Sequence, residues 1–351
     1  LRVGIPEYRL PRDVLDTEVE RLMQAGVEIR TNTRVASLDV LFDLGYEAVF
    51  VTVGAHQSLR LRIEGEEGPG VVNGATFLRE VNLGLRPSIG PVVGVVGGGN
   101  VAIDAARTAL RLGAREVKLL YRRSREQMPA DPAEVEQALE EGVELRFLLA
   151  PTRIERANKQ LQVTCIRFEL GEPDASGRPR PVPVEGSEFT IQLDTLVSAI
   201  GQAPQVPEDF KVRIGRGSTI HVDPVTLLTN RPGVFAGGDA VTGPATVTQA
   251  LAAGRLAAWR IDEYLQHRYP LPHEVQKETV AEDLQPKTVE AIRRAHRVEP
   301  PHVAPEARVR DFSPIELIYD WETAVDEARR CLRCGMGAEI LFQDHCATCL
   351  N

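Results

Sequence analysis

Apolar side chains recur at helical spacing near the start of the chain and predict a helix over residues 12–25, ended by Gly26. The residues expected on its apolar face are Val14, Leu15, Val19 and Leu22. The alternating pattern of residues 27–35 then predicts a strand, and the continuous apolar run 47–55 predicts a buried strand that leads into a glycine. Helix and strand therefore alternate from the beginning of the chain.

The clearest periodicity lies between residues 91 and 150. Strands are expected at 91–97, 116–121 and 143–151, and helices at 101–113 and 131–142. The inner face of the first of these helices should consist of Ala102, Ala105, Ala106, Ala109 and Leu110. Strands that alternate with helices of this length predict the α/β class, with a parallel sheet and helices on its faces.

The later part of the chain adds an antiparallel excursion and two more buried strands. Residues 151–192 contain two alternating runs around a polar turn, which predicts an antiparallel pair. Buried strands are expected at 194–202 and 233–241, and a long helix begins near Ala245. From about Leu271 the sequence is polar and punctuated by proline, which predicts a linker with one short helix before a final helix over 321–335.

Composition narrows the class of protein. The chain has 351 residues, enough for two domains with an appendage. Its formal net charge of −9 argues against nucleic acid as the main partner, because phosphate binding needs clustered Lys and Arg. No apolar run approaches the ~20 residues that cross a bilayer, and the N-terminus has no signal-peptide pattern. We therefore expect no membrane span and a cytoplasmic protein.

A glycine-rich motif stands between the first strand and the first helix of the 91–150 region. Gly97 permits the tight turn, Gly99 leaves room for a pyrophosphate, and the small Ala102 lets helix and strand pack closely. The free N–H groups and partial positive charge of the helix N-terminus suit phosphate. The candidate residues of this dinucleotide site are Gly97, Gly98, Gly99, Asn100, Val101 and Ala102. The competing interpretation is a tight structural turn.

Two arginines at the end of the second strand indicate which dinucleotide is bound. An NAD site usually has Asp or Glu there, whereas this chain has Arg122 and Arg123 after Tyr121. Guanidinium groups are fixed charges and bidentate donors, which suit a 2′-phosphate. NADP(H) is therefore expected rather than NAD(H), with Arg125 as a further candidate contact. The alternative is a basic surface turn.

These motifs together resemble a known family, the NADPH-dependent flavoproteins typified by the glutamate synthase small subunit. The matching stretches include GIPEYRLP, VVGGGNVAIDAARTALRLGA, LLYRRSREQMPA, LVSAIGQ and GVFAGGDAVTGPATVTQALAAGRLAA. They extend over roughly residues 2–265 at the spacing of the family. The resemblance implies two Rossmann-like dinucleotide-binding domains, with the NADPH domain inserted into the FAD domain, followed by a Cys-rich tail.

The resemblance also implies domain boundaries. The FAD domain would consist of residues 1–57 and 203–268, the NADPH domain of 58–202, the linker of 269–322 and the cysteine segment of 323–351. One departure is that no first GxGxxG motif precedes Gly54, and the chain begins at Leu1 rather than at Met. We expect that this motif belongs to sequence outside the chain or is supplied by another chain.

The resemblance further assigns cofactor-binding residues to three stretches. Gly238 and Asp239 would contact the pyrophosphate and ribityl region of FAD, and the helix N-terminus that follows would approach the isoalloxazine. The residues of that N-terminus are Thr246, Val247 and Thr248. The stretch LVSAIGQ adds Ala199, Ile200 and Gly201 to the cofactor-binding set. An ordinary helix N-cap is the alternative role of Asp239.

Four of the five cysteines form two CxxC pairs at the end of the chain, Cys331, Cys334, Cys346 and Cys349. Four thiolates at this spacing suit an iron–sulfur cluster or a structural zinc ion, and unligated thiols are a third possibility. The resemblance to a ferredoxin-like segment favours a cluster of the 4Fe–4S type. Cys165 is isolated and is expected to be a buried apolar residue.

The function implied is electron transfer from NADPH through FAD and iron–sulfur clusters to a partner subunit of a larger complex. The chemistry would belong to the cofactors, so no catalytic acid or base is expected. The alternative is a docking subunit that has lost FAD and uses its cysteine tail to bind a partner.

Overall fold

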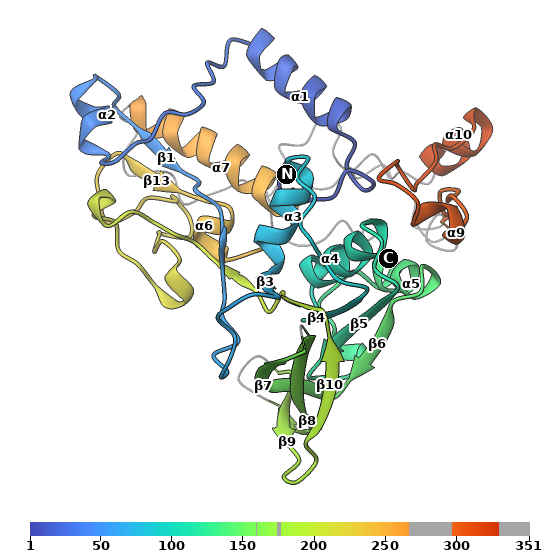
Figure 1. Cartoon of the computed structure of the whole chain (residues 1–351). Coiled ribbons are helices and arrows are strands. Elements are labelled where there is room, and N and C mark those ends of the chain that lie inside the picture. Colours follow the sequence, from blue (N-terminus) through green and yellow to red (C-terminus); the bar gives the residue numbers. More distant parts are fainter. Residues whose placement is uncertain (159, 174–176, 267–296, 330–351) are drawn as a thin grey trace.

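The computed structural model describes residues 1–158, 160–173, 177–266 and 297–329. Its centre is a five-stranded sheet in which all neighbours are parallel. The strand order is β3 (Val71–Asn73), β11 (Thr195–Ser198), β4 (Val92–Val96), β5 (Glu116–Tyr121) and β6 (Glu144–Phe147). The helices that connect these strands are α3 (Gly74–Asn82), α4 (Asn100–Arg111) and α5 (Pro132–Glu140) (Figure 1). The predicted α/β class with a parallel sheet is confirmed.

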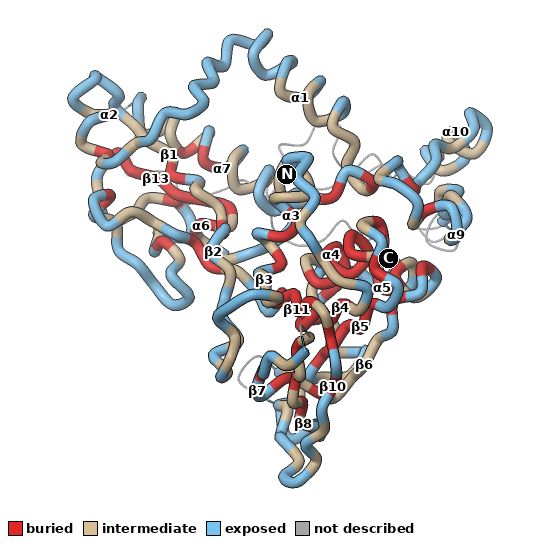
Figure 2. The backbone as a smooth tube through the Cα atoms, in the orientation of Figure 1, coloured by how far each residue is buried: buried red, intermediate tan, exposed pale blue. Residues whose placement is uncertain are grey.

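Helix α4 is buried on more than one side. Its small apolar face packs on the sheet, and Ala102, Ala105, Ala106 and Ala109 are each fully buried. The polar side chains Asp104, Arg107 and Arg111 are buried as well. Figure 2 shows α4 as an almost continuous buried segment. The second buried face does not follow from the apolar pattern of the helix.

A second sheet, antiparallel, is attached to the parallel one. It contains β10 (Phe189–Leu193), β8 (Gln160–Pro173) and β7 (Leu149–Ala157) in that order, and β9 (Pro179–Pro183) also pairs with β8. The single strand predicted at 143–151 is wrong, because the chain divides there into β6 and β7. Leu148 lies between them in the left-handed region, with φ 55°. This conformation turns the chain out of the parallel sheet and into the antiparallel one.

The remaining strands explain how the parts of the chain are connected. β1 (Val49–Val51) pairs in parallel with β13 (Val234–Ala236), although the whole parallel sheet lies between them in sequence. The strands that enter and leave that intervening region, β2 (Gln57–Ser58) and β12 (Gln202–Ala203), pair with each other. The predicted insertion of one unit into another is therefore confirmed, while the exact domain boundaries stay predictions.

The outer unit has a core of its own around β1 and β13. Its helices are α2 (Asp39–Asp43), α6 (Asp239–Thr242) and α7 (Val247–Leu265). Buried residues at its centre include Leu38, Val51, Phe210, Ile220, Val234 and Ala236. Its described connections include the 3-10 turns η2 (Glu208–Phe210) and η3 (Arg216–Ser218), whereas η1 (Arg125–Gln127) follows β5 in the inserted unit.

One expectation for the N-terminal region is wrong. Helix α1 (Arg12–Gln24) forms as predicted, and it has no buried residue (Figure 2). Val14 and Leu22 are 49% and 53% exposed. The strand predicted at 27–35 does not form. That segment pairs with no described strand, and an alternating pattern without a neighbour to supply hydrogen bonds does not make a stable strand.

The described C-terminal residues include α9 (Pro305–Arg308), which is the one short helix of the predicted linker within the described part, and α10 (Trp321–Arg329). The four tail cysteines lie outside the described residues. Among the described helices, none is long and apolar enough to cross a membrane.

Candidate nucleotide-binding site

The glycine turn between β4 and α4 has a different steric requirement at each position. Gly97 has φ 146°, and a Cβ there would lie 2.2 Å from the carbonyl oxygen of Ala199. A Cβ on Gly98 would lie 2.4 Å from the ring of Tyr121. A Cβ on Gly99 would have only Pro129 in reach, at 3.9 Å. The first two glycines therefore allow the turn to fold, whereas the third leaves open space in front of the helix.

The start of α5 braces this turn. The Asn100 side-chain oxygen accepts a hydrogen bond from the backbone N–H of Asp131 at 2.9 Å, and the Gly98 carbonyl accepts one from Ala130 at 3.1 Å. Asp131 in turn caps α5 through the N–H of Ala133. Because Asn100 and Val101 begin α4, their N–H groups have no acceptor within the helix. A braced helix N-terminus with such free N–H groups has the geometry that suits an anion.

The same edge of the sheet contains the point where the strand order reverses. From β4 the chain proceeds through β5 to β6 in one direction, while β11 and β3 lie on the other side of β4. Ligands of open parallel sheets bind at such a reversal, outside the carboxyl ends of the strands. Ala199 follows β11 and donates to the Val96 carbonyl at 2.8 Å, which brings it against Gly97.

The other two residues of that stretch are less enclosed. Ile200 is 38% exposed at the carboxyl edge of the sheet. The Gly201 carbonyl accepts a hydrogen bond from Leu59 at 3.0 Å, so it is part of the connection between the two units. The structure therefore joins Ala199 to the glycine turn and Gly201 to the connecting strands.

The arginines after β5 differ in their surroundings. Arg122 is exposed and forms no hydrogen bond or ion pair with the described residues. Arg123 is half-buried, and its Nε donates to the Pro179 carbonyl at 3.1 Å. Arg125 forms an ion pair with Glu136 at 2.6 Å. Of the three, Arg122 is the guanidinium that is available to a ligand.

The second glycine-rich turn connects β13 to α6. Gly238 has φ 62° and ψ −153°, which a residue with a side chain rarely adopts. Asp239 begins α6, and its carboxylate accepts a hydrogen bond from the N–H of Ala245 at 3.3 Å. Burial raises the pKa of Asp239. This turn and the start of α7 are therefore held together by the Asp239 side chain.

The start of α7 is exposed and well capped. The Thr246 hydroxyl accepts a hydrogen bond from the N–H of Gln249 at 3.2 Å, and the Gln249 side chain accepts one from the N–H of Thr246 at 3.0 Å. This capping box occupies the Thr246 side chain. Val247 is 41% exposed, and Thr248 is exposed too. Backbone groups rather than the Thr246 side chain are left to meet a cofactor.

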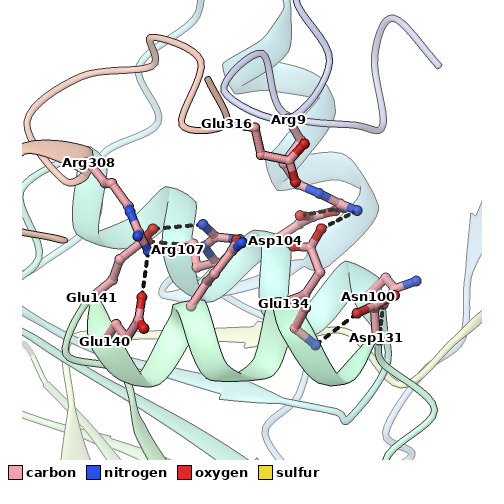
Figure 3. A network of polar contacts seen from close by, with 12 residues as sticks. Arg9, Asn100, Asp104, Arg107, Asp131, Glu134, Glu140, Glu141, Arg308 and Glu316 are labelled. Atoms are coloured by element: carbon pink, nitrogen blue, oxygen red, sulfur yellow. Dashed lines mark hydrogen bonds and ion pairs between the residues drawn. The ribbon is translucent and has the colours of Figure 1, made fainter. Parts of the chain in front are cut away.

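Sequence reasoning missed a buried ionic cluster behind the glycine turn (Figure 3). Glu141 accepts hydrogen bonds from Arg107 and Arg111, each with a closest distance of 2.7 Å, and all three side chains are fully buried. Arg9, from the N-terminal segment, reaches Asp104 at 2.8 Å and Glu134 at 2.6 Å. The composition of α4 gives no signal for these partners, because they come from distant parts of the chain.

The cluster shifts the ionisation of its carboxyl groups in opposite directions. Burial raises the pKa of Asp104 to about 6, and the ion pair with Arg9 opposes this increase only in part. Burial would also raise the pKa of Glu141, but the hydrogen bonds from Arg111 and Arg107 hold it below its ordinary value. The carboxyl group of Asp104 on α4 and that of Glu141, directly after α5, therefore ionise in different pH ranges.

Cys165 is the only cysteine among the described residues and is fully buried. Burial raises its pKa to about 12. It lies in β8 within the apolar core between the two sheets, as expected from the sequence. The part of the chain that the structure describes contains no group of three or more metal-ligating His, Cys, Asp or Glu residues.

Comparisons with known proteins agree with this geometry. The family model described as pyridine nucleotide-disulphide oxidoreductase matches residues 11–254. The NADP(+)-dependent formate dehydrogenase subunit beta of Moorella thermoacetica is 47% identical over 355 residues, which cover 95% of this chain and 49% of that protein. The NADPH-Fe(3+) oxidoreductase subunit beta of Geobacter sulfurreducens is 39% identical over 373 residues, 95% of this chain and 55% of its own. The chain thus spans about half the length of these curated relatives.

One further relative and one solved structure complete the comparison. The glutamate synthase (NADPH) small chain of Escherichia coli is 37% identical over 287 residues, which cover 76% of this chain and 61% of that protein. The structure of FprA from Mycobacterium tuberculosis in complex with NADPH superimposes with a TM-score of 0.60 at 19% identity, over 76% of this chain and 74% of the other. At this identity the superposition indicates a shared fold.

Proposed function

Because the chain belongs to the pyridine nucleotide-disulphide oxidoreductase family, we propose that it is a flavoprotein module that moves electrons between NADPH, FAD and the iron–sulfur clusters of a partner complex. The relatives named as subunits of NADP- or NADPH-dependent enzymes support partner subunits for this chain too. The observation that carries the proposal is the open space at Gly99 in front of the α4 N-terminus, with the exposed Arg122 directly after the neighbouring strand β5.

The NADP half of the proposal assigns a role to each residue of the first site. The N–H groups at the start of α4, from Asn100 and Val101, bind the pyrophosphate, and Gly99 lets it approach. The Arg122 guanidinium binds the 2′-phosphate, because it carries a fixed charge and has no competing partner among the described residues. Arg123 contributes positive potential while its Nε holds the Pro179 carbonyl.

At the second site, we propose that backbone groups rather than side chains contact FAD. Gly238 allows close approach, since a Cβ there would have no atom nearer than 3.6 Å, and the exposed start of α7 supplies N–H groups with a partial positive charge. Thr246, Val247 and Thr248 are the residues proposed at that N-terminus. When bound, FAD would accept a hydride and release its electrons one at a time. These residues fit that role by orienting the cofactor rather than by acid–base chemistry.

We assign Cys331, Cys334, Cys346 and Cys349 to an iron–sulfur cluster, of the 4Fe–4S type, on the basis of their spacing. Iron and acid-labile sulfide should be present in anaerobically purified protein. Zinc without iron would overturn this part of the proposal. Flavin absorbance in the same preparation tests the FAD assignment, and its absence would favour the docking subunit.

The NADP assignment is tested by the kinetics of Arg122→Ala with both dinucleotides. We expect the KM for NADPH to rise about 10- to 150-fold, the equivalent of a charged hydrogen bond worth about 1.5–3 kcal/mol, while the KM for NADH hardly changes. Arg86→Ala is a matched control, because Arg86 is exposed and lies before β4, at the opposite edge of the sheet. Equal effects of Arg122→Ala on both dinucleotides would contradict the assignment.

A further inference from the structure

Residues 298–317, here called the strap, lie against the helices of the nucleotide site on the side away from the glycine turn (Figures 1 and 3). Arg308 forms an ion pair with Glu140 on α5 at 2.7 Å. The ring of His302 is 3.1 Å from the side-chain nitrogen of Gln137, also on α5. The strap is thus attached to α5 by polar contacts at two successive turns.

The strap also contacts the N-terminal segment through Tyr8. The N–H of Ile315 donates to the Tyr8 carbonyl at 3.2 Å, and the rings of Phe312 and Tyr8 are 6.4 Å apart. Ile315 and Tyr8 are both buried, with exposed fractions of 3% and 1%. Tyr8 is therefore enclosed by the strap on one side.

On its other side Tyr8 packs against α4. The guanidinium of Arg111 lies 3.9 Å from the centre of the Tyr8 ring, and that of Arg107 lies 5.0 Å from it. The next residue, Arg9, holds Asp104, which is one turn from the first residue of α4. A continuous chain of contacts therefore extends from the strap, through Tyr8 and Arg9, to the helix that begins the nucleotide site.

The strap is much less firmly held than the cluster beneath it. Between residues 298 and 317 only Arg308 and Ile315 are buried. The carboxylate of Glu140 is 44% exposed, whereas Glu141 and its two arginines are fully buried. Few buried residues, and an ion pair whose carboxylate is partly open to solvent although its guanidinium is buried, are typical of an element that opens locally while the rest stays folded.

We propose that the strap exists in docked and released states, and that docking holds α4 in the position that binds the dinucleotide. The inference rests on the proposed function, because it concerns the affinity of the Gly97–Ala102 site. By linkage, nucleotide binding must then favour the docked strap by the same factor with which the docked strap favours nucleotide binding. Tyr8 and Arg9 are positioning residues in this scheme, since they act through α4.

The experiment combines hydrogen exchange with titration by NADP⁺ on the full chain. Exchange of the strap backbone, measured by mass spectrometry, reports docking, and calorimetry reports the Kd for NADP⁺. We expect saturating NADP⁺ to slow exchange in the strap of the wild type. Arg308→Ala should speed that exchange at least about tenfold and weaken NADP⁺ binding at least about fivefold, within the usual range of coupling between sites.

Two controls separate docking from general damage. Arg310→Ala removes an exposed arginine of the same segment and should change neither quantity. Tyr8→Phe keeps the ring and removes a buried hydroxyl that has no hydrogen-bond partner among the described residues, so it should behave as the wild type. Ile315→Ala is a second way to release the strap, with the same expected result as Arg308→Ala.

The outcomes that contradict the inference are distinct from failure of the proposed function. Faster strap exchange in Arg308→Ala with an unchanged Kd for NADP⁺ would show that docking and binding are independent. Unchanged exchange in both Arg308→Ala and Ile315→Ala would show that the strap does not open separately. A wild-type chain that binds no NADP⁺ would overturn the proposed function itself, and the inference with it.

Discussion

Replacement of Glu141 by Gln tests how the fold stabilises the helices behind the nucleotide site. Glu141 is the shared acceptor of Arg107 and Arg111, with a closest distance of 2.7 Å to each guanidinium, and none of the three side chains is exposed. Glutamine has nearly the same volume and keeps one acceptor oxygen. The substitution therefore removes the negative charge that the two guanidinium groups share. Arg107 keeps its ion pair with Glu134 at 2.9 Å, whereas the buried Arg111 loses its carboxylate partner.

The burial of this cluster determines how much folding stability Glu141→Gln should remove. Removal of one partner from a buried ion pair costs about 3–5 kcal/mol, because the remaining charge, here that of Arg111, is buried without compensation. At about 2–4 °C per kcal/mol for a domain of 150–250 residues, the melting temperature should fall by about 6 °C or more. Glu18→Gln is a matched control, because Glu18 forms an Arg pair on α1 in which both side chains are at least 60% exposed. Such exposed pairs contribute about 0–1 kcal/mol.

Thermal and denaturant unfolding of the two variants, followed by circular dichroism, give the comparison. The account predicts a large loss for Glu141→Gln and a change within about 0.5 kcal/mol for Glu18→Gln. If both variants unfold like the wild type, the buried charges are compensated by something other than this cluster, and the reasoning is refuted.

Three further predictions use the same geometry. Gly99→Ala should fold normally yet lose NADP⁺ affinity. Gly98→Ala should instead lower the melting temperature, because its Cβ would lie 2.4 Å from the Tyr121 ring. Melting curves and NADP⁺ titrations that do not separate the two variants would contradict this prediction. The pKa of Asp104 is raised from 3.8 to about 6, so the wild type should be most stable relative to Asp104→Asn below about pH 4 and should lose that advantage as the pH rises through 6. Urea unfolding of both proteins at several pH values measures this difference in stability. A difference that does not vary with pH would refute the prediction. Cys165, whose pKa is raised to about 12, should resist alkylation in the native protein and react in denaturant. Peptide mapping of the alkylated protein measures this difference, and rapid labelling of the native protein would refute the burial of Cys165.

The βαβ region could be predicted from sequence because its signals are local. The apolar run of β4, the glycines at 97–99 and the alanine face of α4 occur within twenty residues, and each determines the conformation of its own segment. The capped start of α7 is equally local, since Thr246 and Gln249 are three residues apart.

The features that escaped prediction depend on distant partners or on backbone handedness. The second buried face of α4 requires Tyr8, Arg9 and Glu141, which no pattern within the helix reveals. The division of 143–151 into two strands depends on the left-handed conformation of Leu148, which is unusual for a residue with a large side chain. The segment 27–35 alternates like a strand but has no described neighbour to pair with.

The distinction between Arg122 and Arg123 illustrates the same limit for the site. The sequence indicates two equivalent guanidinium groups after β5. Only the fold reveals that the Arg123 side chain donates to Pro179 in the antiparallel sheet, while Arg122 is exposed. The residue types in a motif can therefore indicate the chemistry of a site, whereas the fold is needed to assign that chemistry to one residue.

Titration of the chain with 2′,5′-ADP and with 5′-ADP tests the central claim most directly, because neither the flavin nor the redox partner takes part. The account predicts that 2′,5′-ADP binds about 10- to 150-fold more tightly, and that Arg122→Ala removes most of this preference. Equal affinity for the two nucleotides, or a preference that survives Arg122→Ala unchanged, would contradict the assignment of the Gly97–Ala102 turn and Arg122 to NADP(H).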